Sequence, residues 1–211
     1  MERCVWLARH GDRQDFADPG WAATADRPFD PPLSALGRRQ ARALARRLAS
    51  EPLAHLFSSP FLRCVETTSP IADALELAIA LDDGLSEWLN REWFPERPAL
   101  MDPAAAARCF PRVDPAYCSR GAAEHGEGGE QALRRAGRLA RRLVDEFEGD
   151  LLLVGHGASV LGAAAELLGV RVGPAGGLLP SELPTASLTK LVRQGGASWH
   201  LALRADTCHL G

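Results

Sequence analysis

Short, almost wholly apolar runs alternate along this chain with longer stretches in which apolar residues recur every three or four positions. The clearest runs are residues 3–8 (Arg-Cys-Val-Trp-Leu-Ala) and 150–154 (Asp-Leu-Leu-Leu-Val), and shorter ones cover residues 55–59 and 79–81. Runs without polar alternation are typical of strands that are buried on both faces of a parallel sheet. The pattern therefore predicts four strands of an α/β fold.

Helical spacing fills the sequence between these runs. Ser34 is a predicted helix N-cap, because apolar residues recur from Leu36 to Leu48 with arginines on the opposite face. Pro60 is expected to open a second helix that extends to about residue 76. Three further helices are predicted over Pro103–Phe110, Glu130–Phe147 and Ser159–Leu168.

Two stretches lack this regularity, and one pattern near the C-terminus predicts a turn. Residues 14–32 are rich in proline and are predicted to form a loop. Residues 88–129 show weak periodicity, and we interpret them as an insertion over one face of the domain. Residues 187–193 and 198–204 flank Gln194-Gly195-Gly196, which predicts an antiparallel hairpin and hence a mixed sheet.

Length and composition fit one globular domain. The chain has 211 residues, of which 46% are hydrophobic and 24% charged, and this excludes a disordered or low-complexity protein. We expect residues 1–211 to form a single α/β domain, a three-layer αβα arrangement around a mixed, mostly parallel sheet, with an insertion at about residues 88–129. The sequence has no apolar run of the length that a signal peptide or membrane span needs, so a cytoplasmic protein is expected.

Charge and cysteine content exclude further classes of protein. The formal net charge of −3 gives no electrostatic reason to expect nucleic acid or an anionic membrane as a partner. Five scattered cysteines without a CxxC pair predict neither a zinc site nor a disulfide framework, although a Cys109–Cys118 bridge stays open. Lys190 is the only lysine among the 24 basic residues, a bias that we interpret as mostly compositional. The arginine pairs expected to be solvent-exposed are 38–39, 46–47, 134–135 and 141–142.

Two histidines follow apolar runs and lie beside glycine. The chain reads Arg9-His10-Gly11 after the first run and Gly155-His156-Gly157 after the last of the four. In open α/β sheets ligands bind at the carboxyl ends of the strands, so both histidines are expected to face one crevice. Arg63, in the segment Ser58–Arg63, is expected to reach the same edge at the start of its helix. Planar, permanently charged guanidinium groups beside imidazoles suit a tetrahedral dianion.

These motifs, in this order, resemble those of the histidine phosphatase superfamily, which has the phosphoglycerate mutase-like fold. The resemblance rests on Arg9-His10-Gly11, Ser58-Ser59-Pro-x-x-Arg63, Gly126-Glu127 before a helix, and Gly155-His156-Gly157. The segment Leu33–Ala41 is also similar to the start of a helix in that family. The matches extend from residue 5 to about residue 168, so the resemblance covers most of the chain.

A closer resemblance is to the phosphatase domains of the TULA proteins and to the insect ecdysteroid-phosphate phosphatases. It rests on Arg-His-Gly-Asp-Arg at 9–13, Ser-Pro-Phe-Leu-Arg-Cys-Val-Glu-Thr at 59–67 and Gly-Leu-Ser-Glu-Trp at 84–88. Asp12 stands where that pattern has glutamate. The sequence Asp12-Arg13-Gln14 also departs from the pattern of the mutases and fructose bisphosphatases of the superfamily, which argues against mutase activity.

The resemblance implies that His10 is the nucleophile and forms a phosphohistidine intermediate, which divides one displacement into two. One ring nitrogen of His10 must then stay free while a backbone carbonyl holds the other. Arg9, Arg63 and His156 would bind the phosphoryl oxygens and stabilise the charge of the transition state. Further predicted phosphate contacts are Gly11 and Arg13.

Glu87 is the candidate general acid, which would protonate the leaving oxygen and then activate water. This role needs a raised pKa, and Trp88 is expected to supply an apolar wall beside the carboxyl group. Asp12 and Glu127 are rival acids, and Glu127 is alternatively expected to cap or orient the helix that begins at about residue 130. No metal and no cofactor are expected, because the arginines would do the work of a cation.

The sequence thus predicts a metal-independent phosphatase that hydrolyses phosphomonoesters of a small molecule or a phosphoprotein. Two alternatives stay open: a phosphoglycerate mutase or sugar bisphosphatase of the same superfamily, and a catalytically idle phospholigand-binding module. The hydrophobic content gives mild support for a homodimer. The aromatic side chains of the insertion would either contact a leaving group or form a small core of their own, and they are Trp88, Trp93, Phe94, Phe110 and Tyr117.

Overall fold

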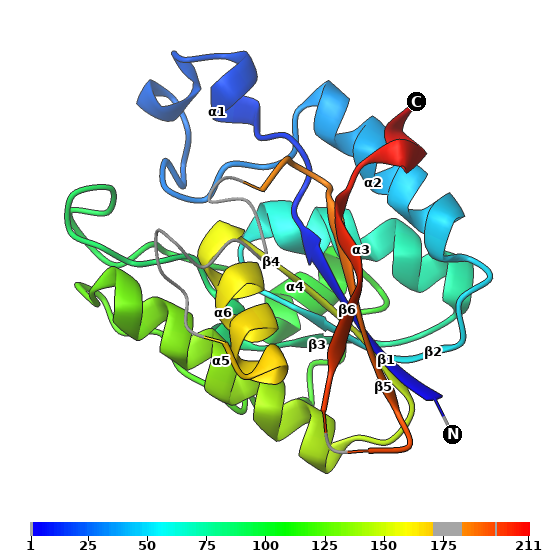
Figure 1. Ribbon diagram of the computed structural model, residues 1–211. Helices are drawn as coiled ribbons and strands as arrows, with labels where there is room; N and C mark the ends of the chain where they lie inside the picture. Colours follow the sequence, from blue (N-terminus) through cyan, green and yellow to red (C-terminus); the bar gives the residue numbers. More distant parts are fainter. Residues whose placement is uncertain (1, 171–182, 197) are drawn as a thin grey trace.

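The computed structural model describes residues 2–170, 183–196 and 198–211, and a six-stranded sheet lies at its centre (Figure 1). Across the sheet the strand order is β3-β2-β4-β1-β5-β6. The strands are β1 Glu2–Arg9, β2 Leu53–Ser58, β3 Ile79–Leu81, β4 Asp150–Gly155, β5 Leu188–Gln194 and β6 His200–Asp206. Every strand predicted from the apolar runs is present, within a few residues of its expected bounds.

The sheet is mixed and mostly parallel, as the sequence predicted. The strands β3, β2, β4 and β1 pair in parallel, whereas β5 is antiparallel to β1 and β6 is antiparallel to β5. The β5–β6 pair is the predicted hairpin. The parallel strands therefore end at one common edge of the sheet, to which the loops after β1, β2 and β4 belong.

Helices cover both faces of the sheet and produce the predicted three layers (Figure 1). The longer helices α2 and α3, with α4, pack on one face, and α5 and α6 pack on the other. The helices are α1 Gln14–Ala17, α2 Ala35–Leu48, α3 Leu62–Leu75, α4 Pro103–Cys109, α5 Gly129–Glu146 and α6 Gly157–Leu168. Short 3₁₀ turns cover Trp21–Ala23, Asp83–Leu85 and Cys208–Leu210.

Alternate side chains of β1 and β4 enter different layers. Trp6 and Leu152 lie in the apolar cluster with α2 and α3, whereas Leu7 and Leu153 lie in the cluster with α5 and α6. None of these four side chains is more than 2% exposed. Strands that carry large apolar residues on both faces are stable only between two layers of helices, so the unbroken apolar runs place β1 and β4 at the centre of the sheet.

The stretch 14–32 is less irregular than predicted, because it contains α1 and the turn Trp21–Ala23. Both elements are a single turn long, too short for apolar periodicity to indicate them. The predicted cap of α2 is confirmed, since Ser34 Oγ accepts a hydrogen bond from the Gly37 N–H at 3.0 Å. A capping bond of this kind satisfies one of the unpaired donors at the start of a helix.

The aromatic side chains of the segment 88–129 divide into two groups. Phe94 is buried against Phe61, and Phe110 and Tyr117 pack against the two main clusters, so these three serve the core. Trp88 is half-buried and Trp93 is 55% exposed, and their rings meet edge to face with centroids 5.2 Å apart. Of the five, Phe94 alone belongs to a small separate cluster, whereas Phe110 and Tyr117 pack against the main core, so the expectation of a core formed by the segment itself is wrong for these two.

Asp82 ties the segment 88–129 to the end of β3. Its buried carboxylate accepts hydrogen bonds from Gly84 N, Tyr117 Oη, Ser119 Oγ, Arg120 N and Gly121 N. A buried carboxylate is costly unless donors surround it, and here five do so. Burial, together with the hydrogen bond to Asp82, raises the pKa of the Tyr117 phenol well above its ordinary value.

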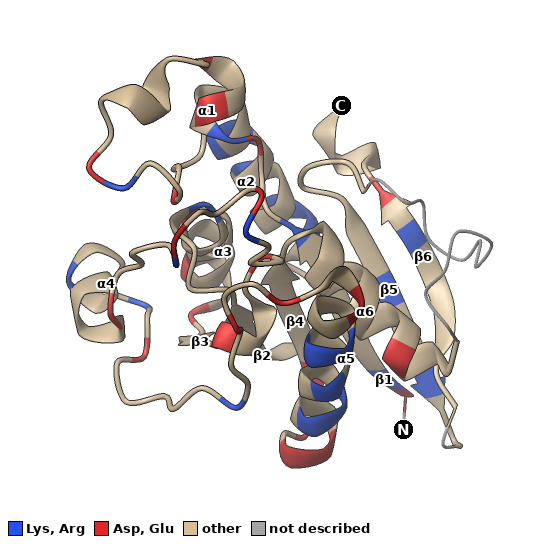
Figure 2. Ribbon diagram, turned by 90° about the vertical axis from the view of Figure 1, so that its left-hand side faces the viewer, with Lys and Arg blue, Asp and Glu red and all other residues tan. Residues whose placement is uncertain are grey.

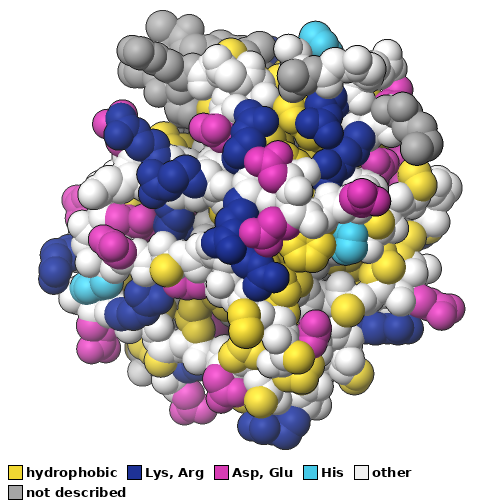
Figure 3. Space-filling model, turned by 90° about the horizontal axis from the view of Figure 1, so that it is seen from below, with side chains coloured by type: hydrophobic (Ala, Val, Ile, Leu, Met, Phe, Trp, Pro, Cys, Tyr) yellow, Lys and Arg dark blue, Asp and Glu magenta, His cyan; other side chains and the backbone are white. Residues whose placement is uncertain are grey.

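The structure agrees with the predictions for the cysteine pairing and for most of the surface arginines, although Arg47 and Arg141 are half-buried. All five cysteines are free, which excludes a Cys109–Cys118 bridge. Figure 2 shows bands of basic residues along α2 and α5, and on the face seen in Figure 3 arginines alternate with acidic side chains. The predicted exposure of the arginine pairs is wrong for Arg135, which is only 6% exposed. Within the described ranges, no helix has the length and apolarity to cross a bilayer.

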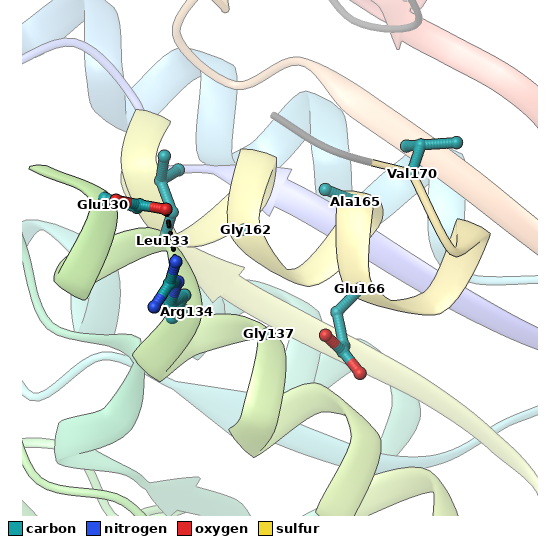
Figure 4. A pocket seen from close by; sticks show the side chains of 8 residues that line it. All are labelled: Glu130, Leu133, Arg134, Gly137, Gly162, Ala165, Glu166 and Val170. Carbon is teal, nitrogen blue, oxygen red and sulfur yellow. Dashed lines mark hydrogen bonds and ion pairs between the residues drawn. The ribbon is translucent and has the colours of Figure 1, made fainter. Parts of the chain in front are cut away.

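Helices α5 and α6 cross closely where each carries a glycine, Gly137 and Gly162 (Figure 4). A Cβ atom on Gly162 would lie 2.2 Å from the backbone oxygen of Leu133. Such a contact with backbone atoms cannot be relieved by a side-chain rotation, so the helices would have to separate. The closeness of α5 to α6 therefore depends on the missing side chain at this position.

We predict that Gly162→Ala lowers the free energy of unfolding by about 1–3 kcal/mol, because overpacking outweighs the better helix propensity of alanine. Urea denaturation followed by circular dichroism measures this change. Gly157→Ala is the matched control in the same helix, since nothing lies within 4 Å of a Cβ at that position. Equal stability of the two variants would contradict the close packing.

Candidate active site

Three neighbouring strand ends bring the predicted site residues together. Arg9 lies opposite Gly155 in the β1–β4 pair, and Ser58 lies opposite Val154 in the β2–β4 pair. The residues that follow these strands, His10 and His156, have ring centroids 5.2 Å apart. The two histidines therefore share one site, as the sequence predicted.

The ring of His10 is held by one nitrogen and leaves the other for chemistry. His10 is 1% exposed, and its Nδ1 lies 2.7 Å from the carbonyl oxygen of Gly11. A carbonyl can only accept, so Nδ1 carries the proton and Nε2 keeps its lone pair. This is the arrangement that the sequence analysis required of a nucleophilic histidine.

Gly11 itself is committed to contacts inside the protein. Its N–H donates to Thr67 Oγ1 at 3.0 Å, and a Cβ atom at this position would lie 2.8 Å from the carbonyl oxygen of Gly37. The predicted phosphate contact through this N–H is therefore replaced by a contact with α3. Gly11 orients His10 and allows the loop after β1 to lie against α2.

The pKa of His10 lies well below its ordinary value. Burial is the main cause, because it penalises the imidazolium form, and the charges of Arg63 and His156 act in the same direction. His10 is consequently a neutral imidazole at neutral pH, which is the form that can act as a nucleophile.

His156 contacts three polar side chains. Its Nε2 lies 2.9 Å from Ser59 Oγ, and its Nδ1 lies 3.1 Å from Arg63 Nη2 and 3.2 Å from Glu87 Oε2. Burial lowers the pKa of His156 to about 4, with Glu87 opposing the shift and Arg63 adding to it. The Cys64 thiol, 3.5 Å from Nε2, has a pKa raised by burial to about 12 and remains protonated.

Arg63 is the buried cation of the site. Its side chain is 1% exposed, and Nη2 donates to Glu87 Oε2 at 3.3 Å. Among the described residues, neither Nε nor Nη1 of Arg63 has a hydrogen-bond acceptor. Buried donors on a charged group are rarely left unpaired in native proteins, so these two mark a place for an anion.

Asp30 fixes the turn of α3 that carries Arg63. Its buried carboxylate accepts a hydrogen bond from the Leu62 N–H at 2.7 Å and lies 3.2 Å from the guanidinium of Arg27. Burial raises the pKa of Asp30, while the Leu62 hydrogen bond and the charges of Arg63 and Arg27 oppose that rise. Sequence reasoning did not single out Asp30, because a loop aspartate 32 positions from its partner Leu62 carries no local signal.

Glu87 differs from the expectation of a raised pKa. Burial alone would raise it, but the charge and hydrogen bond of His156 and the charge of Arg63 hold it well below its ordinary value. The Trp88 indole Nε1 donates to the Glu127 carbonyl oxygen at 2.8 Å, and the Trp88 backbone N–H donates to Glu87 Oε1 at 3.0 Å. The pKa of Glu87 is therefore set by its polar neighbours His156 and Arg63 and not by an apolar wall.

Arg9 and Arg13 flank these groups. Arg9 ends β1, and its Nη1 donates to the Leu183 carbonyl oxygen. Arg13 is held by Asp15, with Nε donating to Oδ1 at 2.9 Å, and its guanidinium lies 4.4 Å from the ring centre of Phe16. Arg13 is near enough to contribute, after larger effects of burial, to the lowered pKa values of Arg63 and His156.

The two rival acids have structural partners of their own. Asp12 accepts a hydrogen bond from Ser34 Oγ at 2.6 Å, which ties the loop after β1 to the start of α2. Glu127 lies just before α5, and its Oε2 accepts a hydrogen bond from Nε of the buried Arg135 at 3.0 Å. Gly128, and not Glu127, is the N-cap of α5.

Arg135 was missed because arginine was read as a surface residue. Its position nonetheless carried a signal, since it lies three residues after Ala132 and four before Leu139, both on the buried face of α5. A charged residue at helical spacing with the apolar stripe indicates a buried pair. The partner, Glu127, could not be identified from spacing alone.

The site suits an anion better than a metal ion. His10, Glu87 and His156 each offer one ligand atom, and these atoms lie within 4.8 Å of one another. Arg63 Nη2, however, lies 3.1 Å from His156 Nδ1 and 3.3 Å from Glu87 Oε2. A permanent cation at this distance repels a second cation and attracts a phosphate-like group.

Known proteins resemble the chain over nearly its whole length. A family model described as the histidine phosphatase superfamily (branch 1) matches residues 5–207. The 55 kDa subunit of transcription factor tau from Saccharomyces cerevisiae is 29% identical in an alignment 188 positions long that covers 78% of this chain and 41% of that protein. The ecdysteroid-phosphate phosphatase of Drosophila melanogaster is 24% identical in an alignment of 205 positions that covers 79% of this chain and 27% of that protein. A probable phosphoglycerate mutase of Yersinia pestis is 29% identical in an alignment of 212 positions, gaps included, that covers 98% of this chain and 94% of that protein.

A solved structure matches as well. The ecdysone phosphate phosphatase of Bombyx mori, determined in complex with tungstate, superimposes with a TM-score of 0.78 and 22% identity over 96% of this chain and 93% of that one. This likeness confirms the phosphoglycerate mutase-like fold. The chain spans only 41% of the length of the yeast relative and 27% of the fly relative.

We predict that the imidazole ring of His156 stays neutral down to about pH 5, because burial lowers its pKa to about 4, and that the His10 ring does not titrate near pH 6.5, because burial lowers its pKa as well. Long-range ¹H–¹⁵N NMR spectra recorded from pH 7.5 to 4.5 report the ring protonation directly. His10→Ala identifies the signals of that ring. Since the unfolded chain takes up these protons below about pH 6.5 and the folded one does not, the free energy of unfolding should also fall as the pH is lowered from 6.5 to 5. Titration of either ring near pH 6.5 would contradict the prediction.

Proposed function

Because this chain belongs to the histidine phosphatase superfamily, we propose that it is a metal-independent phosphomonoesterase that works through a phosphohistidine intermediate on His10. The observation that carries the proposal is the buried Arg63 guanidinium, whose Nε and Nη1 have no acceptor among the described residues. These donors lie beside an imidazole that is neutral and keeps one nitrogen free. A phosphoryl group bound between the two would meet donors on one side and the free nitrogen of His10 on the other.

In the first step, His10 Nε2 attacks the phosphorus atom of the substrate. The bond from nitrogen to phosphorus forms while the bond from phosphorus to the leaving oxygen breaks. Arg63, together with Arg9, Arg13 and His156, would contact the phosphoryl oxygens and stabilise the charge that they carry in the transition state. The hydrogen bond from His10 Nδ1 to the Gly11 carbonyl oxygen stabilises the positive charge that the ring acquires.

Glu87 would donate the proton that the leaving oxygen needs. Its pKa is low as long as Arg63 and His156 act on it alone, but a bound phosphoryl dianion would offset these groups and raise the pKa of Glu87. Binding of the substrate would therefore raise the pKa of Glu87 toward the range in which its carboxyl group can donate a proton. In the second step the Glu87 carboxylate takes a proton from water, whose oxygen attacks phosphorus and releases phosphate and free His10.

Two other functions fit parts of this site. The similarity to a probable phosphoglycerate mutase supports transfer of the phosphoryl group back to substrate, whereas the departure at Asp12-Arg13-Gln14 favours transfer to water. An idle phospholigand-binding module would not need a nitrogen of His10 kept free. Turnover of phosphoglycerates that depends on a bisphosphoglycerate primer would identify the mutase.

Substrate, domain organisation and cellular setting are part of the same proposal. A phosphorylated small molecule suits the site, and phosphoproteins and a homodimer are further candidates to be tested by a panel of esters and by sedimentation. We propose that residues 88–129 belong to the same domain and shape the entrance, which the packing of Phe94 on Phe61 supports. A reducing compartment such as the cytoplasm would keep the five thiols free.

We predict that the protein hydrolyses p-nitrophenyl phosphate in the presence of a chelator and that His10→Ala lowers kcat by at least about 10³-fold. With ³²P-labelled substrate and a rapid quench that avoids acid, the native protein should show a phosphoenzyme that acid then hydrolyses, and the variant should show none. His200→Ala, which removes an exposed histidine, is the control and should behave as the native protein. Activity that survives in His10→Ala, or that disappears with the chelator, would exclude this mechanism.

We also predict that Glu87→Gln slows the first turnover of an alkyl phosphate such as glycerol 2-phosphate by about 10²–10⁴-fold, because an alkoxide needs a proton to leave. Release of p-nitrophenolate in the first turnover should change far less, since this anion leaves without a proton. Stopped-flow and quench measurements give both rates. An equal loss with the two substrates would assign Glu87 a role other than proton donor.

A further inference from the structure

We propose that Arg135, through its buried ion pair with Glu127, is a positioning residue that fixes the backbone of Glu87 and thereby aims its carboxyl group at the leaving oxygen. The inference rests on the proposed function, because it concerns the residue assigned there as the proton donor. It adds a role for two residues of α5 and the segment before it that do not touch the substrate.

The guanidinium of Arg135 binds the backbone on the N-terminal side of Glu87. Nη1 donates to the Gly84 and Ser86 carbonyl oxygens at 2.8 and 3.1 Å, and Nη2 donates to the Glu87 carbonyl oxygen at 3.1 Å. The same guanidinium holds Glu127 through Nε at 3.0 Å and Nη2 at 2.5 Å. All five bonds lie in one planar group, which only arginine can supply.

Glu127 binds the chain on the other side of Glu87. Its carbonyl oxygen accepts the indole N–H of Trp88 at 2.8 Å, and its Oε1 lies 3.4 Å from the backbone nitrogen of Leu89. Residues before and after Glu87 are therefore held by one ion pair. We call Arg135 and Glu127 together the clamp.

The base of the clamp is rigid. Arg135 is followed on α5 by Ala136 and Leu139, which are 0% and 3% exposed, and Leu139 belongs to the core cluster with β4 and α6. A helix packed in this way moves little relative to the sheet. Through Arg135, the backbone of Glu87 is therefore held in a fixed position relative to the sheet that carries His10 and His156.

Stability alone does not account for the clamp, and positioning of Glu87 does. A buried ion pair contributes little net stability compared with apolar residues of similar volume, because both charges lose their hydration. Here Glu87 has to approach His156 within 3.2 Å and still face the substrate, in a segment without regular structure from residue 86 to residue 102. Errors of about 1 Å in the position of a catalytic group cost large factors in rate, so a fixed backbone has a direct effect on proton transfer.

The test compares Arg135→Lys with Arg134→Lys. Lysine at 135 keeps the charge next to Glu127 but cannot donate in one plane to three carbonyl oxygens. Arg134 is the matched control on the same helix, since it is 66% exposed and pairs with the exposed Glu130. The readout is the rate of leaving-group release in the first turnover, measured with glycerol 2-phosphate and with p-nitrophenyl phosphate, together with the thermal midpoint of unfolding.

We expect Arg135→Lys to slow first-turnover release from glycerol 2-phosphate at least about tenfold and release from p-nitrophenyl phosphate less than about threefold. Arg134→Lys should leave both rates unchanged. In the Glu87→Gln background the Arg135 substitution should have almost no additional effect on glycerol 2-phosphate, because the group that it positions is already absent.

An equal loss with both substrates, or an effect that persists undiminished in the Glu87→Gln background, would overturn the proposal. Glu127→Gln, which keeps the shape of the clamp and removes its negative charge, provides the second variant if Arg135→Lys does not fold, and it should show the same dependence on the leaving group. Formation of acid-labile phosphoenzyme from p-nitrophenyl phosphate in these variants separates failure of the clamp from failure of the phosphohistidine mechanism, which His10→Ala tests.

Discussion

Parallel pairing of β1 with β4 sets Arg9 opposite Gly155, and the pairing of β2 with the other side of β4 sets Ser58 opposite Val154. This register brings the residues that follow the three strands close together, although they come from distant parts of the sequence. Both faces of β1 and β4 are buried, so a register shift of one residue would exchange the layers that Trp6 and Leu7 enter and disrupt the packing on both faces. The same burial that stabilises the sheet thus determines the distance between the two histidines.

A local excess of positive charge exists in a protein whose net charge is −3. Arg63 keeps its charge although it is 1% exposed, whereas the histidines next to it lose theirs because burial and the guanidinium both oppose protonation. One group thereby provides the attraction for an anion and adds to the burial that keeps His10 unprotonated. Glu87 compensates Arg63 from one side only, and two of the guanidinium donors remain without a protein acceptor in the described part of the chain.

Prediction from sequence succeeded where local pattern determines structure. The apolar runs gave β1 and β4, the spacing after Ser34 gave α2, and the motifs around His10 and His156 located the site, because strand ends of a parallel sheet converge. It failed where the outcome depends on contacts between distant segments. The low pKa of Glu87 results from groups on α3 and after β4, and the burial of Arg135 results from a partner in a segment without periodicity.

The contact between Trp88 and Glu127 joins positions that are 39 residues apart in sequence. This contact closes the segment between Trp88 and Glu127 into a loop. The entropy lost on closing a loop depends only weakly on the number of residues in it. Added residues in its exposed parts, such as the stretch around Trp93, would therefore cost little closure entropy. Replacement of Phe94, Phe110 or Tyr117 would instead disturb the clusters that they pack against, so the segment is tolerant of changes in length only between these fixed points.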